Sequence, residues 1–567
     1  QRLPLDGEDI TLAASRTTLV PWRIDVKRNA PLRMLDRSLR RSVMIAAALA
    51  SLAAGSALAQ QSAEATGHYD VLIRNGRVLD GNGNPWFRAD VGLVGARIEA
   101  VGDLAEATAD RVIDATGLYV APGFIDTHSH AGGGLTTAGL SHARPLLAQG
   151  ITTVFVNPDG GGAVDLAEQR AELLAHGLGV NVAQLVPHGS VRSAVIGMED
   201  RLATPAELER MRTLVRRGMT EGAWGLSSGP FYAPGSYSDT RELVELARVA
   251  AEYGGSYQSH VRDESTYTIG VMAAVEEVVT VAREAGSPGV WSHAKALGPE
   301  VWGYPLALIR RLEQARNEGV EVYMDQYPYT ASATSLAAAL LPRWAQAGGG
   351  DSLQARLSRP DDLARIRGEM VENLARRGGA DRIQFRRFPQ DPSIEGRTLA
   401  DVAREREVDA IEAAVQLFRE GSPSIVSHNM DERDVELIMA HPMTMTASDG
   451  GLVPWQEGVP HPRSYGAFTR KLETYVLEQH VVSLEQAVHS MTSLPARVYR
   501  MPDRGQILPG AVADLVVFDL ARVHTPAVFT DPHHLSEGMV HVFVNGQSAI
   551  TDEAFTGTLA GEVLRKR

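Results

Sequence analysis

The chain has 567 residues, of which 44% are apolar and 22% charged, so it can bury a large core and is not disordered as a whole. Its formal net charge of −14 argues against general binding to nucleic acid or to an anionic membrane surface. The sequence contains no cysteine, which excludes disulfides, thiolate metal ligands and a cysteine nucleophile.

The N-terminal region has the pattern of an export signal. A basic segment opens at Met34, an apolar and small-residue run covers 42–58, and Ala57-Leu-Ala59 matches a signal-peptidase site. We therefore expect a signal peptide over 34–59, cleavage after Ala59, a periplasmic or secreted protein, and no stable membrane insertion. Twin-arginine export and an uncleaved inner-membrane anchor are the alternatives. Residues 1–33 precede a natural start and are interpreted as upstream or non-native sequence.

Short β segments follow the signal, and similar β sequence returns near the C-terminus. The first set alternates apolar and polar residues and ends at Asn-Gly and Asp-Gly turn signals. The second set includes 513–519 and 540–546. Because both ends of the chain share this character, we expect one small β-sandwich built from 60–122 and 501–567.

Between these segments, strand and amphipathic helix patterns alternate, which is typical of parallel β/α units. The helix expected over 240–253, for example, places Leu243, Leu246 and Val249 on one face. We therefore predict an α/β fold with a (β/α)8 TIM-type barrel over 123–500. Eight apolar runs are its candidate strands: 123–127, 151–156, 180–186, 222–227, 255–260, 288–293, 321–326 and 443–448.

A long segment, 331–423, interrupts this alternation. It is rich in Arg, Gly and Pro, carries helical patterns of its own, and is followed by a ninth apolar run at 424–427 that exceeds the eight-strand count. We interpret 331–423 as an insertion after the seventh strand. Long insertions at that end of a barrel often form lids, so we expect this one to cover the active site.

Metal-ligand residue types stand at the ends of several predicted strands. Asp126, His128 and His130 alternate along the end of the first strand, so their side chains can share one face. Neutral imidazoles and carboxylates are the usual ligands of zinc-like metals, and barrel active sites lie at the carboxyl ends of the strands. Each histidine alone also fits a hydrogen-bonded strand end. Together they predict a metal site whose ligands are His128, His130, His260, His293 and Asp449.

These motifs resemble the amidohydrolase superfamily and, more closely, the N-acyl-D-amino-acid deacylases (D-aminoacylases). The likeness covers about 68–560 and rests on six motifs, which begin at Gly222, Ser259, Ser292, Tyr327, Ala447 and His461. It implies a metal-dependent hydrolase of carbon–nitrogen bonds in linear amides other than peptide bonds. The implied substrate is a small N-acyl-D-amino acid. The implied cofactor is one or two zinc ions, with manganese or cobalt as alternatives, and Asp449 is the implied acid–base catalyst.

The sequence departs from these deacylases at one ligand. They carry a cysteine after the second strand, and the matching residue here is Asp159. Only four of the basic residues are lysines, and none lies near that strand, so a carboxylated lysine is excluded as well. A carboxylate can bridge two cations, and we expect Asp159 to be the shared ligand. A turn role for Asp159 and a ligand role for Asn157 are the alternatives.

Substrate contacts are predicted from positions near this site. Lys295 lies two residues after His293, and Arg463 lies in the loop after the eighth strand. Both suit a free α-carboxylate, which Arg binds bidentately. Tyr232 and Tyr329 are expected to supply supporting hydroxyl groups. Two further histidines near strand ends are expected to have structural or supporting roles, namely His188 and His428.

Other functions fit the same residues. The machinery suits a dipeptide, a lactam, or a ring of the hydantoinase or dihydroorotase type. A barrel that binds a ligand without catalysis is a more distant alternative, because the whole ligand set and Asp449 are present.

Overall fold

The computed structural model describes residues 67–566. The predicted signal peptide and the segment before it lie outside these residues. Within 67–566, no helix has both the length and the apolar character that a membrane span requires.

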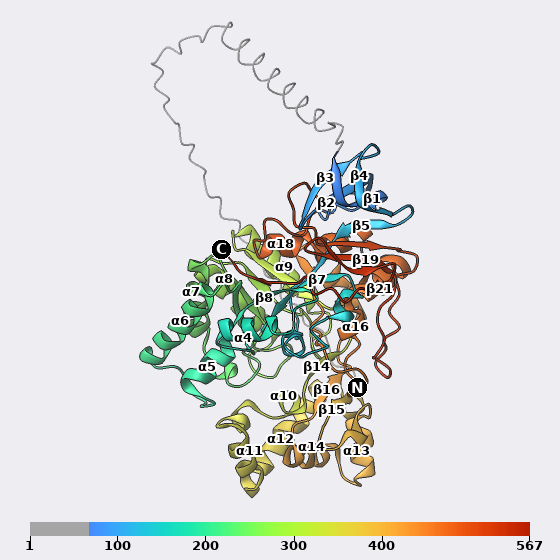
Figure 1. Ribbon diagram of the computed structural model, residues 1–567. Helices are drawn as coiled ribbons and strands as arrows, with labels where there is room; N and C mark the ends of the chain where they lie inside the picture. The colour runs from blue at the N-terminus through green and yellow to red at the C-terminus, as the bar shows by residue number, and fades with distance from the viewer. Residues whose placement is uncertain (1–66, 567) are drawn as a thin grey trace, which may run out of the picture. The chain divides into compact units, whose positions relative to one another are not determined.

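Eight parallel strand positions form the barrel, as the apolar runs predicted (Figure 1). The third position is split at Leu185 into β8 and β9, so that one part pairs with β7 and the other with β10. The first and last barrel strands are bridged just beyond their ends, where the Asp449 N–H donates to the His128 carbonyl at 2.8 Å. The strands are β6 (Phe124–Asp126), β7 (Ile151–Val156), β8 (Asn181–Gln184), β9 (Val186–Pro187), β10 (Gly225–Ser228), β11 (Ser256–Ser259), β12 (Gly289–Trp291), β13 (Val322–Gln326) and β17 (Thr444–Thr446).

The amphipathic helices around the barrel, such as α7, bury one apolar face. In α7 (Thr240–Glu252), the Asp239 side chain caps the first turn, and Leu243, Leu246 and Val249 are fully buried. The other helices between or after barrel strands are α2 (Gly132–Leu135), α3 (Arg144–Leu147), α4 (Leu166–Leu174), α5 (His188–Ile196), α6 (Pro205–Thr220), α8 (Val271–Ala285), α9 (Pro305–Asn317), α15 (Glu432–Met439), α16 (Arg463–Arg470) with its π-helical continuation η5 (Lys471–Glu478), α17 (Leu484–Met491) and α18 (Ser493–Val498).

The interior of the barrel is filled by apolar side chains from its strands. Ile125, Phe155, Val290 and Met445 come from four different strands and belong to one buried cluster. Tyr499 packs against Phe155 with 4.1 Å between ring centroids. Because this layer is closed by apolar side chains, the polar strand ends are left as the place where a site can form.

Strands from both ends of the chain form one nine-stranded sheet next to the barrel (Figure 1). The two groups join where β18 pairs antiparallel with β5, and their apolar side chains share one core. The strands are β1 (His68–Val78), β2 (Phe87–Val94), β3 (Arg97–Gly102), β4 (Thr108–Asp114), β5 (Tyr119–Pro122), β18 (Leu515–Phe518), β19 (Met539–Val544), β20 (Gln547–Thr551) and β21 (Ala554–Phe555).

The last described strand, β22 (Val563–Leu564), pairs with the barrel instead of with this sheet. It lies parallel to β8, and the Trp224 indole N–H donates to the Leu564 carbonyl at 3.0 Å. Those contacts join residues more than 300 positions apart in sequence. The local β pattern that placed 501–567 in one unit could not reveal them.

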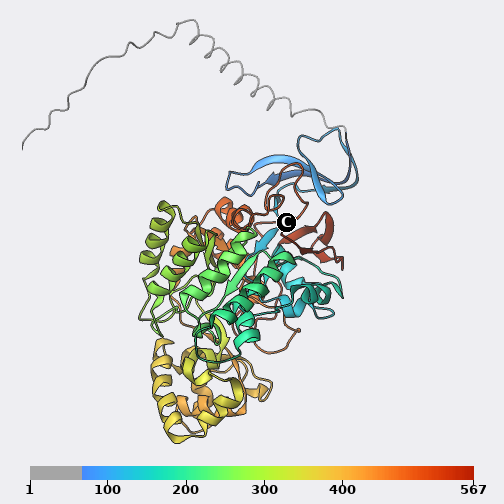
Figure 2. The same ribbon diagram turned by 90° about the vertical axis from the view of Figure 1, so that its left-hand side faces the viewer.

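The segment after β13 forms a lobe of its own, coloured yellow to orange in Figures 1 and 2. Its three antiparallel strands run in the order β14 (Ser332–Ser335), β16 (Ser424–Ser427), β15 (Ile383–Arg387). The ninth apolar run is therefore β16, and the inserted sheet extends to Ser427. The helices α10 (Leu336–Leu340), α11 (Gly349–Leu357), α12 (Pro360–Arg376), α13 (Leu399–Glu405) and α14 (Ala410–Glu420) pack with this sheet around a separate apolar core.

Candidate metal centre

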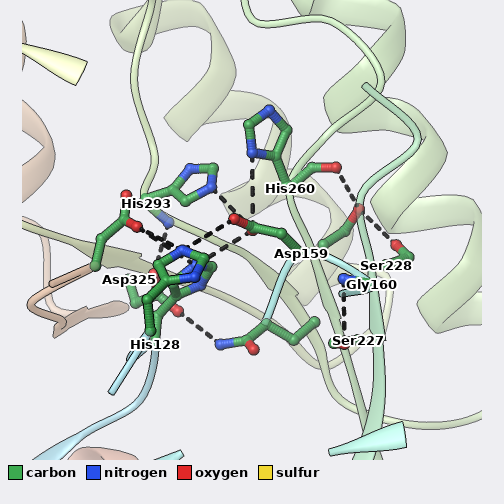
Figure 3. Close-up of polar contacts among 12 residues, drawn as sticks. His128, Asp159, Gly160, Ser227, Ser228, His260, His293 and Asp325 are labelled. Atoms are coloured by element: carbon green, nitrogen blue, oxygen red, sulfur yellow. Dashed lines mark hydrogen bonds and ion pairs between the residues drawn. The ribbon is translucent and has the colours of Figure 1, made fainter. Parts of the chain in front are cut away.

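The turn after β7 directs Asp159 into the barrel mouth. Asn157, Asp159 and Gly160 all have positive φ, at 64°, 55° and 70°. The Ser227 hydroxyl donates to the Asn157 carbonyl at 2.5 Å and accepts from the Gly160 N–H at 3.3 Å (Figure 3). A side chain at Gly160 would lie 3.0 Å from the backbone nitrogens of Gly189 and Gly229, so this turn requires glycine.

Two other candidate ligands also have left-handed backbones. His293 has φ of 36° and Asp449 has φ of 49°. The His293 N–H is held by the Asp325 carboxylate at 2.6 Å. Positive φ is unfavourable for residues other than glycine, and it persists only where the surrounding structure enforces it.

The side chains of four histidines surround the Asp159 carboxylate. Its oxygens lie 3.2 Å from His128 Nε2, 3.2 Å from His293 Nε2, 3.7 Å from His260 Nδ1 and 3.3 Å from His130 Nε2. Figure 3 shows His128, His260 and His293 grouped around this carboxylate. The structure thus brings the six predicted ligands together.

The six residues form two sets of ligand atoms, each within 4.8 Å of one another. One set contains His128, His130, Asp159 and Asp449, and the other contains Asp159, His260 and His293. Asp159 belongs to both. This arrangement offers two neighbouring cation positions that share one carboxylate.

The chemistry of these residues fits a zinc-type cation. Both ring nitrogens of His128 and of His260 are buried, yet make no hydrogen bond to any described residue. Buried polar atoms normally have a partner, and a metal ion supplies one. Nitrogen and carboxylate oxygen donors without thiolate suit zinc and also accept manganese or cobalt.

The titratable groups of the cluster shift one another's pKa values. Burial opposes ionisation of Asp159, but His128 and His293 hold its pKa well below the usual value. Partial burial disfavours charged His130, yet hydrogen bonds to Asp159 and Asp449 raise its pKa to about 9. Burial lowers the pKa of His260 to about 3, which keeps this imidazole neutral, as ligation requires.

Glu264 lies behind His260 and His293 and was not singled out from the sequence. Its carboxylate is 3.3 Å from His293 Nδ1 and 3.7 Å from His260 Nε2, on the side of each ring away from Asp159. It also forms an ion pair with Lys295 at 2.6 Å. A carboxylate on the outer nitrogen orients the ring and sets which nitrogen is free for a metal. The signal for Glu264 was its place four residues after His260.

Asp449 is paired with Arg463. One carboxylate oxygen of Asp449 lies 3.1 Å from His130 Nε2, and the other accepts a hydrogen bond from Arg463 Nη1 at 2.7 Å. Burial opposes ionisation, but the Arg463 charge holds the pKa of Asp449 well below its usual value. Arg463, expected to bind substrate, also holds the predicted acid–base group.

A cavity of about 740 Å³ opens beside this cluster. Asp159, Asp449, Arg463 and Tyr232 line it, together with residues of the insertion. A recess of about 20 Å³ adjoins it and contains Lys295, Glu264 and Tyr327.

Tyr329 lines neither space, so its position does not support the predicted contact with substrate. Its ring packs edge-on against His461 and Phe529. Tyr327, two residues earlier in the same motif, is the tyrosine that reaches the recess, and Arg463 stacks 4.7 Å above its ring. The sequence alone could not decide between them because both flank Pro328.

Several other polar residues near the strand ends have structural partners. The Asn157 amide is bonded to Gln169 and to the Leu185 carbonyl, which leaves Asp159 as the ligand candidate of this turn. Asp126 does not join the metal cluster, because it accepts from the Ser448 N–H and hydroxyl. His188 pairs with Glu242 at 2.8 Å, and His428 packs on Phe529.

Comparison with known proteins agrees with this geometry. Residues 111–550 match the model of the amidohydrolase family. An N-acyl-D-glutamate deacylase of Alcaligenes xylosoxydans xylosoxydans is 36% identical over 88% of this chain and 96% of its own length.

Two solved structures share the fold. An N-acyl-D-glutamate deacylase of Bordetella bronchiseptica, complexed with zinc and a phosphonate mimic of the tetrahedral intermediate, is 35% identical with a TM-score of 0.75, over 88% of this chain and all of its own. A D-aminoacylase studied for its binuclear metal centre is 32% identical with a TM-score of 0.76 over the same shares. The chain therefore belongs to the amidohydrolase family.

Proposed function

We propose that the protein is a zinc-dependent amidohydrolase that removes the acyl group from N-acyl-D-amino acids, releasing a carboxylate and a free D-amino acid. The observation that carries this proposal is the cluster of four histidines and two aspartates beside a substrate-sized cavity. The deacylase relatives, at about 35% identity over most of the chain, supply the substrate class.

The site residues divide into metal-holding and proton-transferring groups. His128, His130, Asp159, His260, His293 and Asp449 would hold the metal, and Asp449 would also transfer the proton. A bound zinc ion polarises a scissile carbonyl and lowers the pKa of water towards neutrality. Asp449 accepts the proton of the attacking water and delivers it to the leaving amine. Because Arg463 keeps Asp449 ionised, this base is ready at neutral pH.

Cationic side chains near Asp449 bind the free α-carboxylate of the substrate. Arg463 lines the cavity itself, and Lys295 lies in the adjoining recess with Tyr327. Tyr232 lines both spaces, and its hydroxyl is 3.4 Å from the Thr334 hydroxyl. These groups orient the amide so that its carbonyl faces the histidine cluster.

The test is a hydrolysis screen on zinc-loaded protein that begins at Gln60. Matched N-acetyl-D- and N-acetyl-L-amino acids, dipeptides, hydantoin and dihydroorotate are compared by release of free amine or ring opening. We expect turnover of the D-series. Turnover of only the cyclic amides or dipeptides, with none of the N-acetyl-D-amino acids, would contradict the proposal.

We further propose that the enzyme works in the periplasm or outside the cell. This part rests on the signal-peptide pattern at 34–59. Expressed from Met34 in a Gram-negative host, the protein should be recovered from the periplasm with Gln60 at its N-terminus. Recovery from the cytoplasm with Met34 retained would overturn it.

A further inference from the structure

The cavity contains an arginine that the proposed reaction does not use. Arg386 comes from β15 of the insertion and lines the same cavity as Asp449 and Arg463. The pairing of β15 with β16 shifts register between Phe385 and Arg387, which places Arg386 at a bulge. Bulges redirect side chains and are frequent next to active sites. The Arg386 carbonyl accepts from the Val459 N–H at 2.9 Å, which ties this bulge to the loop after β17.

Arg386 has no carboxylate partner among residues 67–566, in contrast to its neighbours. Arg387 forms ion pairs with Glu395 and Glu457, and Arg463 pairs with Asp449. The Arg386 side chain makes one long hydrogen bond, from Nε to the Ser424 hydroxyl at 3.4 Å.

The Arg386 guanidinium has no directly paired carboxylate, although the charge of Asp449 acts favourably on it. Burial and the nearby Arg463 lower its pKa to about 10, so the guanidinium still carries its charge at neutral pH. The acidic residues lining the cavity are Asp159 and Asp449, and both belong to the metal cluster. A partly buried cation without a counter-ion is unfavourable, and an anionic ligand relieves this cost.

We propose that Arg386 binds a second carboxylate of the substrate, so that the enzyme prefers N-acyl-D-amino acids with two carboxylates. This inference rests on the deacylase function proposed above, in which Lys295 and Arg463 take the α-carboxylate. The planar fork of Arg matches a carboxylate bidentately. The second carboxylate belongs either to the amino-acid side chain or to the far end of the acyl group.

Two pairs of substrates distinguish these two sources of the second carboxylate. Within each pair, the two members differ by one charge. The first pair is N-acetyl-D-glutamate and N-acetyl-D-glutamine, and the second is N-succinyl-D-alanine and its succinamoyl analogue. The variants are Arg386→Gln, Arg386→Lys and the control Arg404→Gln. Arg404 lies in the same insertion, is 75% exposed and pairs with Asp401, so the control makes the same charge change on the surface.

We expect the parent enzyme to favour the dianionic member of one pair, and that pair identifies the source. Arg386→Gln should lower kcat/KM for that member by roughly 10- to 100-fold, mainly through KM, and change the neutral member by less than about threefold. Arg386→Lys should recover part of the loss, and Arg404→Gln should change neither member.

Equal losses on charged and neutral members, or no loss on either, would overturn the role of Arg386 while leaving the deacylase function intact. Absence of hydrolysis for all four compounds would instead refute the deacylase function. In that case, calorimetric binding to zinc-loaded protein decides the inference. It stands if Arg386→Gln weakens binding of N-acetyl-D-glutamate but not of N-acetyl-D-glutamine, and fails if the two are affected alike.

Discussion

The two sides of the Asp159 carboxylate differ in their access to the cavity. On one side, the His130 side chain is 42% exposed and, with Asp449, faces the cavity. On the other side, His260 and His293 are 5% and 2% exposed, and the recess next to them, at about 20 Å³, is too small for a whole substrate. Both sides contribute a set of metal-ligand atoms, but only the open side borders a cavity large enough for a substrate.

Each side also has a carboxylate that forms an ion pair with a basic side chain. The two pairs lie in different places relative to the imidazole rings. Asp449, with Arg463, stands in front of the ligands and borders the cavity. Glu264, with Lys295, stands behind the imidazole rings. The same kind of ion pair is therefore placed to move a proton on the open side and to orient metal ligands on the closed side. Substitutions at Asp159, Asp449 and Glu264 test this division.

Asp159→Ala should have the largest effect, because Asp159 belongs to both ligand sets. We expect loss of bound zinc and of nearly all activity, measured by elemental analysis and by turnover. Asn157→Ala, in the same turn, should keep its metal because the Asn157 amide bonds to Gln169 instead. Asp159→Cys should regain zinc with an altered metal preference. Full zinc content and turnover in Asp159→Ala would remove Asp159 from the site.

Asp449→Asn should separate chemistry from metal binding on the open side. The amide keeps the shape of the side chain but cannot accept the proton of water. We expect kcat to fall by roughly 10²- to 10⁴-fold, the usual contribution of a positioned acid–base group. Asp159, His260 and His293 should retain zinc on the closed side. A kcat within about threefold of the parent would show that Asp449 is not the acid–base group.

Glu264→Gln should weaken metal binding on the closed side. Removing a group that orients metal ligands typically costs 10- to 100-fold in metal affinity, and we expect a loss of about that size. Competition with a chromophoric chelator measures it, and saturating zinc should restore much of kcat. Glu242→Gln is the matched control, because Glu242 is also buried against a histidine, His188, outside the cluster. Equal zinc affinities for the two variants would mean that Glu264 does not position the ligands.

Lys471 should produce the smallest effect, on stability and not on chemistry. It is buried under β17, where its ammonium donates to the Thr446 and Ser490 hydroxyls, and burial lowers its pKa from 10.5 to about 7. Between these values the unfolded chain binds a proton that the folded chain has lost. This group therefore makes the free energy of unfolding rise with pH from about 7 to about 10.

In Lys471→Met that contribution should be absent. Urea unfolding at pH 7, 8 and 9 measures the slope, which should differ from the parent by on the order of 1 kcal/mol per pH unit. Zinc content should stay the same. Identical slopes would show that Lys471 keeps an ordinary pKa.

Much of the barrel could be predicted from the sequence because its signals are local. An apolar run followed by a polar ligand type marks both a strand and its carboxyl end, so β6 to β13 and the six metal-cluster residues were identified without a structure. The run at 424–427 gave the same local signal, but its partners are β14 and β15 of the insertion. Strand pairing over such distances leaves no local pattern.

The sequence by itself therefore determined the order of strands, the absence of thiolate ligands and the residue types at the barrel mouth. The tertiary structure decided which of these groups face one another. It placed Glu264 behind the histidines, paired Arg463 with Asp449, and brought Tyr327 rather than Tyr329 to the recess. It also left Arg386 without an acidic partner in the cavity. Those outcomes depend on side-chain direction and on contacts between distant segments, whereas residue type and periodicity are properties of the chain alone.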